Sequence, residues 1–285
     1  MKRKFLLFAM AACFNSIFGC KQGVTDPLSP TEIAIVQNSL VKKIDKKELG
    51  CVSFDYDQDY KVTQTTHCQA PLSYQTYSYR DQTVLFTSYY LDTLFLNKKG
   101  YVSRSRHNGS RPSYYPIGTY EYNEEGYLVK EESYHYASHR ESAAWLTFYH
   151  TYADGNRVST LVKFLPDYKT VADSAQINYE YDKSNYNPNL PYEEYDFFGA
   201  ESFSSYFTTF GKHAHTLYGK TNKNLLKAAH VTVFQPRFTH RSYGYFYAYI
   251  FDEKKRPKTL ELSLKIDDEL SSTRYHWEYE YLERQ

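Results

Sequence analysis

The stretch Tyr120–Lys130 reads YEYNEEGYLVK and contains the unit from which most of the chain is built. An aromatic residue ends one strand, Asn123 opens a four-residue turn, and Gly126 closes it before the next strand begins. Asn suits the opening position because its side chain can bond the backbone two residues on, and Gly adopts the left-handed conformation that a bulged hairpin needs. The stretch therefore predicts a β-hairpin.

The same frame recurs along the chain, and its further copies are Leu96–Gly100, Tyr152–Asn156, Tyr181–Asn185 and Phe251–Lys255. Ala153 departs from the frame at the opening position and Lys255 at the closing position. A left-handed residue other than glycine costs about 1–2 kcal/mol, so the last copy is the weakest. The repetition in one register predicts an array of antiparallel hairpins.

The last part of the chain alternates with a period of two. Leu260, Leu262, Leu264 and Ile266 alternate with polar residues, as do Tyr275, Trp277, Tyr279 and Tyr281. Such alternation indicates strands with one buried and one wet face. Between Tyr243 and Tyr249, Phe246 lies opposite the tyrosines and Ile250 follows on its face, so this strand is expected to pack on both faces. The predicted fold class is all-β, an antiparallel meander of roughly a dozen strands over 51–285, curled or closed into a barrel-like sheet.

The N-terminal residues are an export signal. Met1–Lys4 is basic, and the apolar run Phe5–Cys13 is too short to span a bilayer. Ile17–Cys20 is typical of a lipobox, in which Cys20 becomes the acylated N-terminus, although Phe18 stands where a small residue is usual. Residues 1–19 are thus predicted as a lipoprotein signal peptide, and Cys20 as the site of lipidation (palmitate included) in the outer membrane. The alternative is ordinary secretion with earlier cleavage.

After Cys20, residues 20–30 are predicted as a tether, because they are rich in Gly and Pro. The next residues predict the start of a helix. Ser29 is its N-cap, Pro30 its first residue and Glu32 its third. Ile33, Val36, Leu40 and Ile44 share one helical face, which predicts an amphipathic helix over 31–48.

Two cysteines remain in the exported chain, Cys51 and Cys68. An even pair in an oxidising compartment predicts a disulfide, worth about 3 kcal/mol on the loop-entropy model. Two buried free thiols are the alternative.

No motif assigns a reaction to the chain. His213 and His215 would lie on one side of a strand and could form half of a zinc site. Asp55, Asp57 and Asp59 imitate a calcium loop but lack its Gly and Glu, so an Asp-rich turn is the favoured interpretation. A hydrolase could draw an acid–base pair from the carboxylates Glu193, Glu194, Asp196 and Glu201, although no spacing rule fixes their separation. We expect no enzyme, no metal and no cofactor.

The composition of the chain indicates which classes of binding partner to expect. The chain has 32 Tyr, a net charge of +1 and a mean hydropathy of −0.67. Nucleic-acid binding driven by phosphate neutralisation is therefore not expected. Tyr is also favoured at recognition surfaces and for stacking on sugar rings, which makes a glycan or an envelope protein the expected ligand class.

The lipobox, the short tether and the Y-x-Y-[ND]-x-x-G hairpins together resemble lipoproteins of Bacteroidetes bacteria. More narrowly, Lys220–Lys227 (KTNKNLLK) followed by Tyr247–Asp252 resembles the C-terminal half of one such family of unknown function. This resemblance implies a porin-like β-fold over roughly Val52–Gln285. The turn frame is also similar to the YD repeats of secreted toxin shells. Neither resemblance implies a catalytic residue.

The expected protein is therefore a lipid-anchored, non-enzymatic binding or structural module of the cell envelope, on the periplasmic or the surface face. A polysaccharide hydrolase with loop carboxylates and a transmembrane pore are the alternatives. The charged faces argue against the pore, because a lipid-facing wall needs an apolar band.

Overall fold

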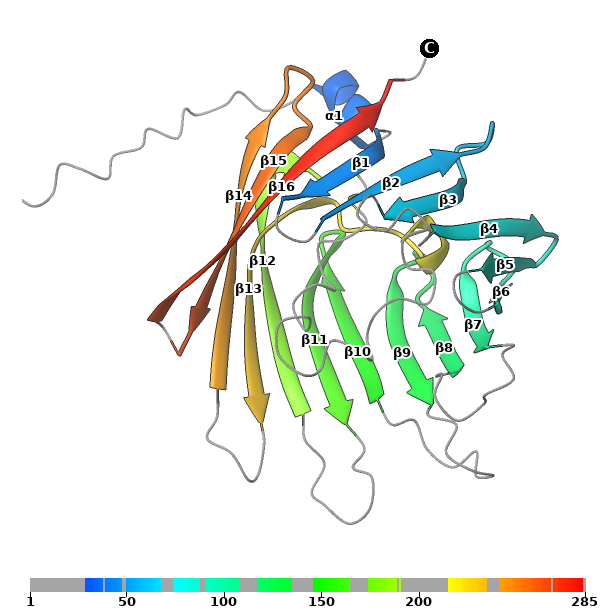
Figure 1. Cartoon of the computed structure of the whole chain (residues 1–285). Coiled ribbons are helices and arrows are strands. Elements are labelled where there is room, and N and C mark those ends of the chain that lie inside the picture. The colour runs from blue at the N-terminus through cyan, green and yellow to red at the C-terminus, as the bar shows by residue number, and fades with distance from the viewer. Residues whose placement is uncertain are drawn as a thin grey trace, which may run out of the picture.

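The computed structural model describes residues 29–37, 39–47, 50–67, 74–87, 91–107, 117–134, 146–164, 174–188, 190, 215–234, 241–267 and 269–283. Within these ranges the chain forms one short helix, one 3-10 turn and a closed antiparallel barrel of 16 strands, more than the dozen predicted. Each strand pairs with its neighbours in the sequence, and β1 closes the barrel by pairing with β16 (Figure 1).

The helices are α1 (Pro30–Gln37) and η2 (His215–Tyr218). The strands are β1 (Leu40–Lys46), β2 (Gly50–Tyr56), β3 (Val62–His67), β4 (Tyr74–Arg80), β5 (Thr83–Thr87), β6 (Leu91–Leu96), β7 (Val102–His107), β8 (Ile117–Tyr122), β9 (Leu128–Tyr134), β10 (Leu146–Ala153), β11 (Asn156–Phe164), β12 (Ser174–Tyr186), β13 (Asn224–Phe234), β14 (Arg241–Phe251), β15 (Pro257–Ile266) and β16 (Glu269–Leu282). None of the helices in these ranges is long and apolar enough to cross a bilayer.

The up-and-down order gives the barrel two different ends. All even-numbered strands end at one end, here called the turn end, where most connections are tight turns and where α1 precedes β1. Figure 1 shows α1 near the end of β16 at this end of the barrel. The opposite end, where β1 ends and β2 starts, is called the loop end, and the connections there reach 11 residues between β9 and β10.

The turn frame is confirmed in three of its copies. Asn97 Oδ1 accepts the backbone N–H groups of Lys99 and Tyr101 at 2.9 and 3.0 Å, and Asn123 and Asp252 open their turns in the same way. The closing residues Gly100, Gly126 and Lys255 have φ of 80°, 97° and 61°.

Two copies of the frame were predicted incorrectly. Asp154 and Gly155 both have positive φ, so β10 and β11 are joined by a two-residue turn in which Ala153 pairs with Asn156. The frame at Tyr181 does not reverse the chain. Asp182 instead accepts the N–H and hydroxyl of Ser184, which produces a bulge between Asp182 and Tyr186 within β12.

A copy that the sequence analysis missed lies at Asp57. Its Oδ1 accepts the N–H groups of Asp59 and Lys61, both at 2.9 Å, and Tyr60 closes the turn at φ 61°. The Asp-rich segment is therefore a hairpin turn, as favoured over a calcium loop. The sequence analysis missed this copy because Tyr60 stands at the closing position, where the frame expects Gly or Asn.

The predicted helix over 31–48 is wrong in its second half. The Ser29–Glu32 capping box forms, with Ser29 N–H and hydroxyl donating to Glu32 at 2.8 and 2.7 Å, but α1 ends at Gln37 and β1 follows. A bulge between Val41 and Lys43 interrupts the alternation of β1, so its buried residues Val41 and Ile44 are three positions apart. The predicted helical face uses Leu40 and Ile44 instead, and a spacing of four positions fits a strand as well as a helix.

Candidate functional site

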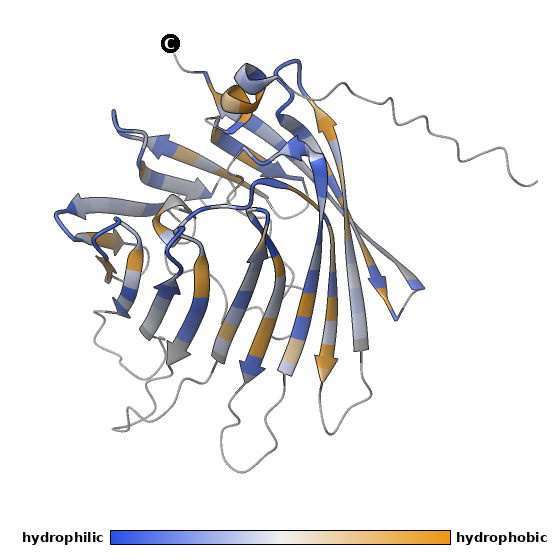
Figure 2. Ribbon diagram, turned by 180° about the vertical axis from the view of Figure 1, so that it is seen from behind, coloured by the Kyte–Doolittle hydropathy of each residue, from blue (hydrophilic) through white to orange (hydrophobic). Residues whose placement is uncertain are grey.

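The barrel wall has an apolar inner face and a polar outer face. Apolar residues of β15 and β16 predicted to be buried do line the interior, including Leu260, Leu262 and Trp277 at 0%, 5% and 3% exposure. Figure 2 shows hydrophilic and hydrophobic residues alternating along the strands. Phe246 and Ile250 lie on the outer face of β14, and Ile250 is 61% exposed, so the expectation that this strand packs on both faces is wrong.

Ion pairs cover much of the outer face. Lys47 Nζ lies 2.8 Å from Glu278, Lys130 Nζ lies 3.0 Å from Glu132, and His230 Nε2 lies 3.2 Å from Glu180. Exposed pairs of this kind stabilise a fold little. Charged pairs on this wall differ from the apolar band that a lipid-facing barrel carries on its outer face.

Tyrosine hydroxyls join neighbouring strands at the turn end. Tyr56 donates to Val41 O (2.5 Å), Tyr79 to Val62 O (3.0 Å), Tyr122 to Val102 O (2.7 Å) and Tyr281 to Pro257 O (2.8 Å). In each case the tyrosine lies on an even-numbered strand, and the acceptor is the backbone carbonyl of the first or second residue of the preceding strand. Burial raises the pKa of Tyr56 and Tyr79, which keeps both hydroxyls protonated as donors. Tyr56 and Tyr122 directly precede the turns at Asp57 and Asn123, so the aromatic residue of the frame fastens neighbouring strands in these two copies.

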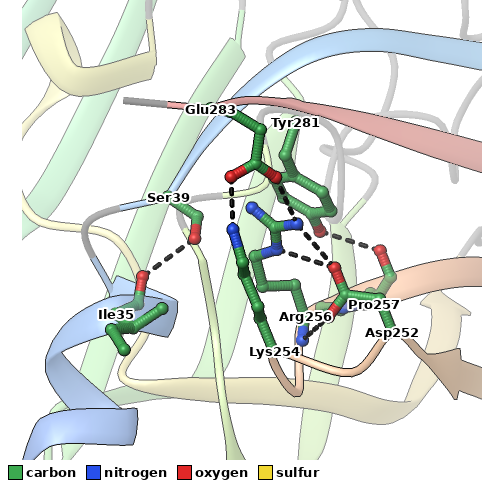
Figure 3. Close-up of polar contacts among 8 residues, drawn as sticks. All are labelled: Ile35, Ser39, Asp252, Lys254, Arg256, Pro257, Tyr281 and Glu283. Carbon is green, nitrogen blue, oxygen red and sulfur yellow. Dashed lines mark hydrogen bonds and ion pairs between the residues drawn. The ribbon is translucent and has the colours of Figure 1, made fainter. Parts of the chain in front are cut away.

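The Arg256 cluster fastens the β14–β15 turn to the end of β16 (Figure 3). Arg256 donates from Nε to Asp252 at 2.7 Å and from a terminal nitrogen to Glu283 at 2.9 Å, and its guanidinium lies 4.4 Å from the Tyr281 ring centroid. Lys254 donates to the same Glu283. The two cations lower the pKa of Glu283 through hydrogen bonds and charge.

A segment that we call the strap, residues 215–223, consists of η2 and the connection from η2 to β13 and crosses the turn end. Lys220 N–H donates to Gly126 O and Lys223 N–H to Gly155 O, both at 2.9 Å. Asn222 Oδ1 accepts the Arg157 N–H at 2.8 Å. Directly after the strap, Asn224 exchanges two hydrogen bonds with Asn156, at 2.9 and 3.0 Å. The strap is therefore tied to the β8–β9 and β10–β11 turns.

The strap also fills part of the interior. Tyr218 is 9% exposed, and its ring centroid lies 5.1 Å from that of Tyr120, edge to face. Burial raises the pKa of Tyr218 well above its ordinary value. Gly219 has φ 93°, and a Cβ there would come within 2.6 Å of Gly126 O. Only glycine fits this crossing, so the strap is held against the β8–β9 turn by close backbone contact.

Polar groups also line the inner wall. His150 Nδ1 lies 2.9 Å from Thr160 Oγ1, which accepts from the Tyr179 hydroxyl at 3.2 Å. Glu131, 4% exposed, is the only buried carboxylate within the described ranges. These positions could not be singled out from the sequence, because a polar residue in a strand gives no local sign that its side chain faces the interior.

The inner wall nearer the loop end carries donors and half-exposed apolar side chains. Val233, Tyr243, Ile266 and Tyr275 are half-buried there. Lys46, 8% exposed, pairs with Trp277 across β1 and β16, and its Nζ lies 4.2 Å from the indole centroid. Burial and the charge of Lys46 lower the pKa of His67 on β3.

The Trp277 indole N–H is unsatisfied. Its Nε1 is buried and has no hydrogen-bond partner in the structure as described. Leaving a buried donor without an acceptor costs about 1–3 kcal/mol, and few such groups occur in native proteins. This donor therefore needs an explanation.

The other predicted site residues are placed as follows. Cys51 is disulfide-bonded, whereas Cys68 lies outside the described residues, so their pairing stays a prediction. Cys20, His213 and the carboxylates Glu193, Glu194, Asp196 and Glu201 also lie outside them. His215 begins η2, so the strand geometry assumed for a His213–His215 zinc site is wrong at His215. Within the described ranges no group of His, Cys, Asp and Glu could hold a metal.

Comparisons with known proteins identify the fold. No family model matches the chain, and no curated protein matches it. A porin-like protein from Bacteroides uniformis superposes with a TM-score of 0.59 at 12% identity, over 85% of this chain and 98% of that one. A porin-like protein from Bacteroides vulgatus gives a TM-score of 0.56 at 14% identity, over 84% and 97%. The chain thus has a porin-like fold, as the resemblance implied.

Proposed function

We propose that this chain is a non-enzymatic binding module of the bacterial cell envelope, held at the outer membrane by a lipid on Cys20. The observation that carries the proposal is the polarity of the wall, with aromatic residues inside and ion pairs outside. A pore that spans lipid needs the opposite arrangement, an apolar band outside and a wet lumen. An aromatic inner wall instead suits a ligand that stacks on rings, such as a glycan.

The strap supports binding rather than conduction. It crosses the turn end and is tied to two turns by backbone hydrogen bonds, with Tyr218 packed into the interior. A ligand would therefore approach from the loop end, where Tyr243 and Tyr275 on the inner wall are half-buried. The porin-like proteins of Bacteroides that share the fold are consistent with an envelope location.

Anchoring is tested by cell fractionation. Wild-type protein should sediment with membranes, and the Cys20→Ser variant should appear in the soluble envelope fraction. Cys13→Ser is the matched control, since Cys13 would leave with the signal peptide, and this variant should still sediment. A Cys20→Ser variant that sediments like wild type would remove the lipid anchor from the proposal.

Binding is tested with the soluble Cys20→Ser variant on a glycan panel and in pull-downs from envelope extract. We expect retention of a glycan or an envelope protein, with any bound glycan recovered intact. Shortened glycan products would favour the hydrolase, and no ligand in either assay would contradict a binding module.

A further inference from the structure

The inner wall between β16 and β1 contains two neighbouring hydrogen-bond donors. Trp277 and Lys46 are paired across these strands, so their side chains share the inner face, and the Lys46 ammonium lies 4.2 Å from the indole centroid. Both side chains are more than nine-tenths buried, at 3% and 8% exposure. A cation and an N–H group therefore stand together on an otherwise largely apolar surface.

The Trp277 N–H is the observation that points to a ligand. It is fully buried, and none of the described residues accepts a hydrogen bond from it. Tyr and Trp polar groups usually find a partner when buried. An acceptor supplied by a bound molecule would satisfy this donor, and a negatively charged acceptor would also interact with Lys46.

The pair lies toward the loop end of the inner wall. Lys46 is the last residue of β1, whereas β16 starts at Glu269 and extends beyond the end of β1. Figure 1 shows the β15–β16 hairpin projecting there. Tyr275, two residues nearer the loop end on the same face of β16, is half-buried and offers a ring next to the pair.

We propose that Lys46 and Trp277 bind the anionic group of an acidic saccharide whose ring stacks on Tyr275. The carboxylate or sulfate of such a sugar accepts from the indole N–H and from the ammonium, and the sugar face covers the aromatic ring. This site rests on the proposed binding function and names its ligand class.

The test uses Trp277 as its own reporter. The chain has two Trp residues, so Trp145→Phe leaves Trp277 as the single indole. The variant, with its N-terminal segment intact, is titrated with a galacturonate tetrasaccharide, a sulfated heparin tetrasaccharide and neutral maltotetraose. We expect a saturable change in Trp277 emission with at least one acidic probe and at least tenfold weaker binding of the neutral one.

Two matched variants each remove one positive charge, Lys46→Met on the inner face of the wall and Lys47→Met on its outer face. Lys46→Met should weaken binding of the acidic probe at least tenfold. Lys47→Met makes the same change in net charge on the outer face, where Lys47 pairs with Glu278, and should leave the Kd unchanged. Trp277→Phe, measured by calorimetry, should weaken binding while the unfolding midpoint stays the same or rises, because the unsatisfied donor is gone.

Equal affinity for acidic and neutral probes, or unchanged affinity in Lys46→Met, would overturn the site. If the acidic probes fail while the glycan panel or pull-down still finds a ligand, the site is wrong and the proposed binding function stands. If no assay finds a ligand, both are wrong.

Discussion

The contact of the strap with the β8–β9 turn depends on Gly219, and replacing Gly219 with Ala tests that contact. Gly219 lies at φ 93°, and a Cβ would lie 2.6 Å from Gly126 O and 2.9 Å from the Tyr122 ring. Gly100→Ala is the matched control, because Gly100 has φ 80° and no heavy atom lies within 4 Å of its Cβ position.

Gly219→Ala should lose more unfolding free energy than Gly100→Ala, and the difference should equal the free energy of the strap's contact with Gly126. The left-handed backbone costs alanine about 1–2 kcal/mol, offset by about 0.4–1 kcal/mol because alanine restricts the unfolded chain, so Gly100→Ala should lose about 1 kcal/mol. Gly219→Ala carries the same cost and also displaces the strap from Gly126, where the Lys220 N–H bond is worth about 0.5–1.5 kcal/mol. A total loss of about 1.5–2.5 kcal/mol is expected for Gly219→Ala.

Urea unfolding gives the two free energies, and limited proteolysis shows whether the strap has become accessible. We expect cleavage near the strap in Gly219→Ala at urea concentrations where Gly100→Ala is resistant. Equal stability and equal protease resistance in the two variants would show that Gly219 does not hold the strap against the β8–β9 turn.

Three other predictions follow from single contacts. Arg256→Met removes charged hydrogen bonds to Asp252 and Glu283 and should cost about 2 kcal/mol in urea unfolding, whereas Lys254→Met, at an exposed pair with the same Glu283, should change nothing measurable. Lys255→Gly should stabilise by about 0.5 kcal/mol, since glycine relieves the positive φ, and an unstable variant would contradict the turn assignment. Because the folded pKa of His67 is lowered, the unfolded chain takes up the proton first as the pH falls below about 6.5. Stability should therefore fall between pH 7 and pH 5, and His67→Gln should flatten that fall; an identical pH profile would refute the assignment.

Much of the fold could be predicted from the sequence because its signals are local. Asn123, Gly126 and the alternation of Leu260 to Ile266 each act on neighbouring residues, so turns and faces were predicted correctly. The errors lie where a local signal is ambiguous. Leu40 and Ile44 of β1 are spaced as on a helix, and Tyr60 closes a turn in the place of glycine.

The candidate site could not be predicted, since it depends on which strands meet. Lys46 and Trp277 are far apart in the chain and become neighbours only because the barrel closes between β1 and β16. The strap likewise depends on contacts between Gly219 and Gly126 that no local pattern contains. Closure and long-range register are tertiary properties, so composition showed many tyrosines but not which of them face inward.

The central claim, that the aromatic face lies inside and the polar face meets water, is tested most directly by paired cysteine labelling in intact envelope membranes. Ser263 and Leu262 are neighbours on β15 that point outward and inward. Ser263→Cys should react rapidly with a water-soluble maleimide, and Leu262→Cys should react slowly until the protein is denatured. The reverse pattern, with Leu262→Cys labelled and Ser263→Cys shielded, would mean that lipid surrounds the barrel and that the chain forms a pore.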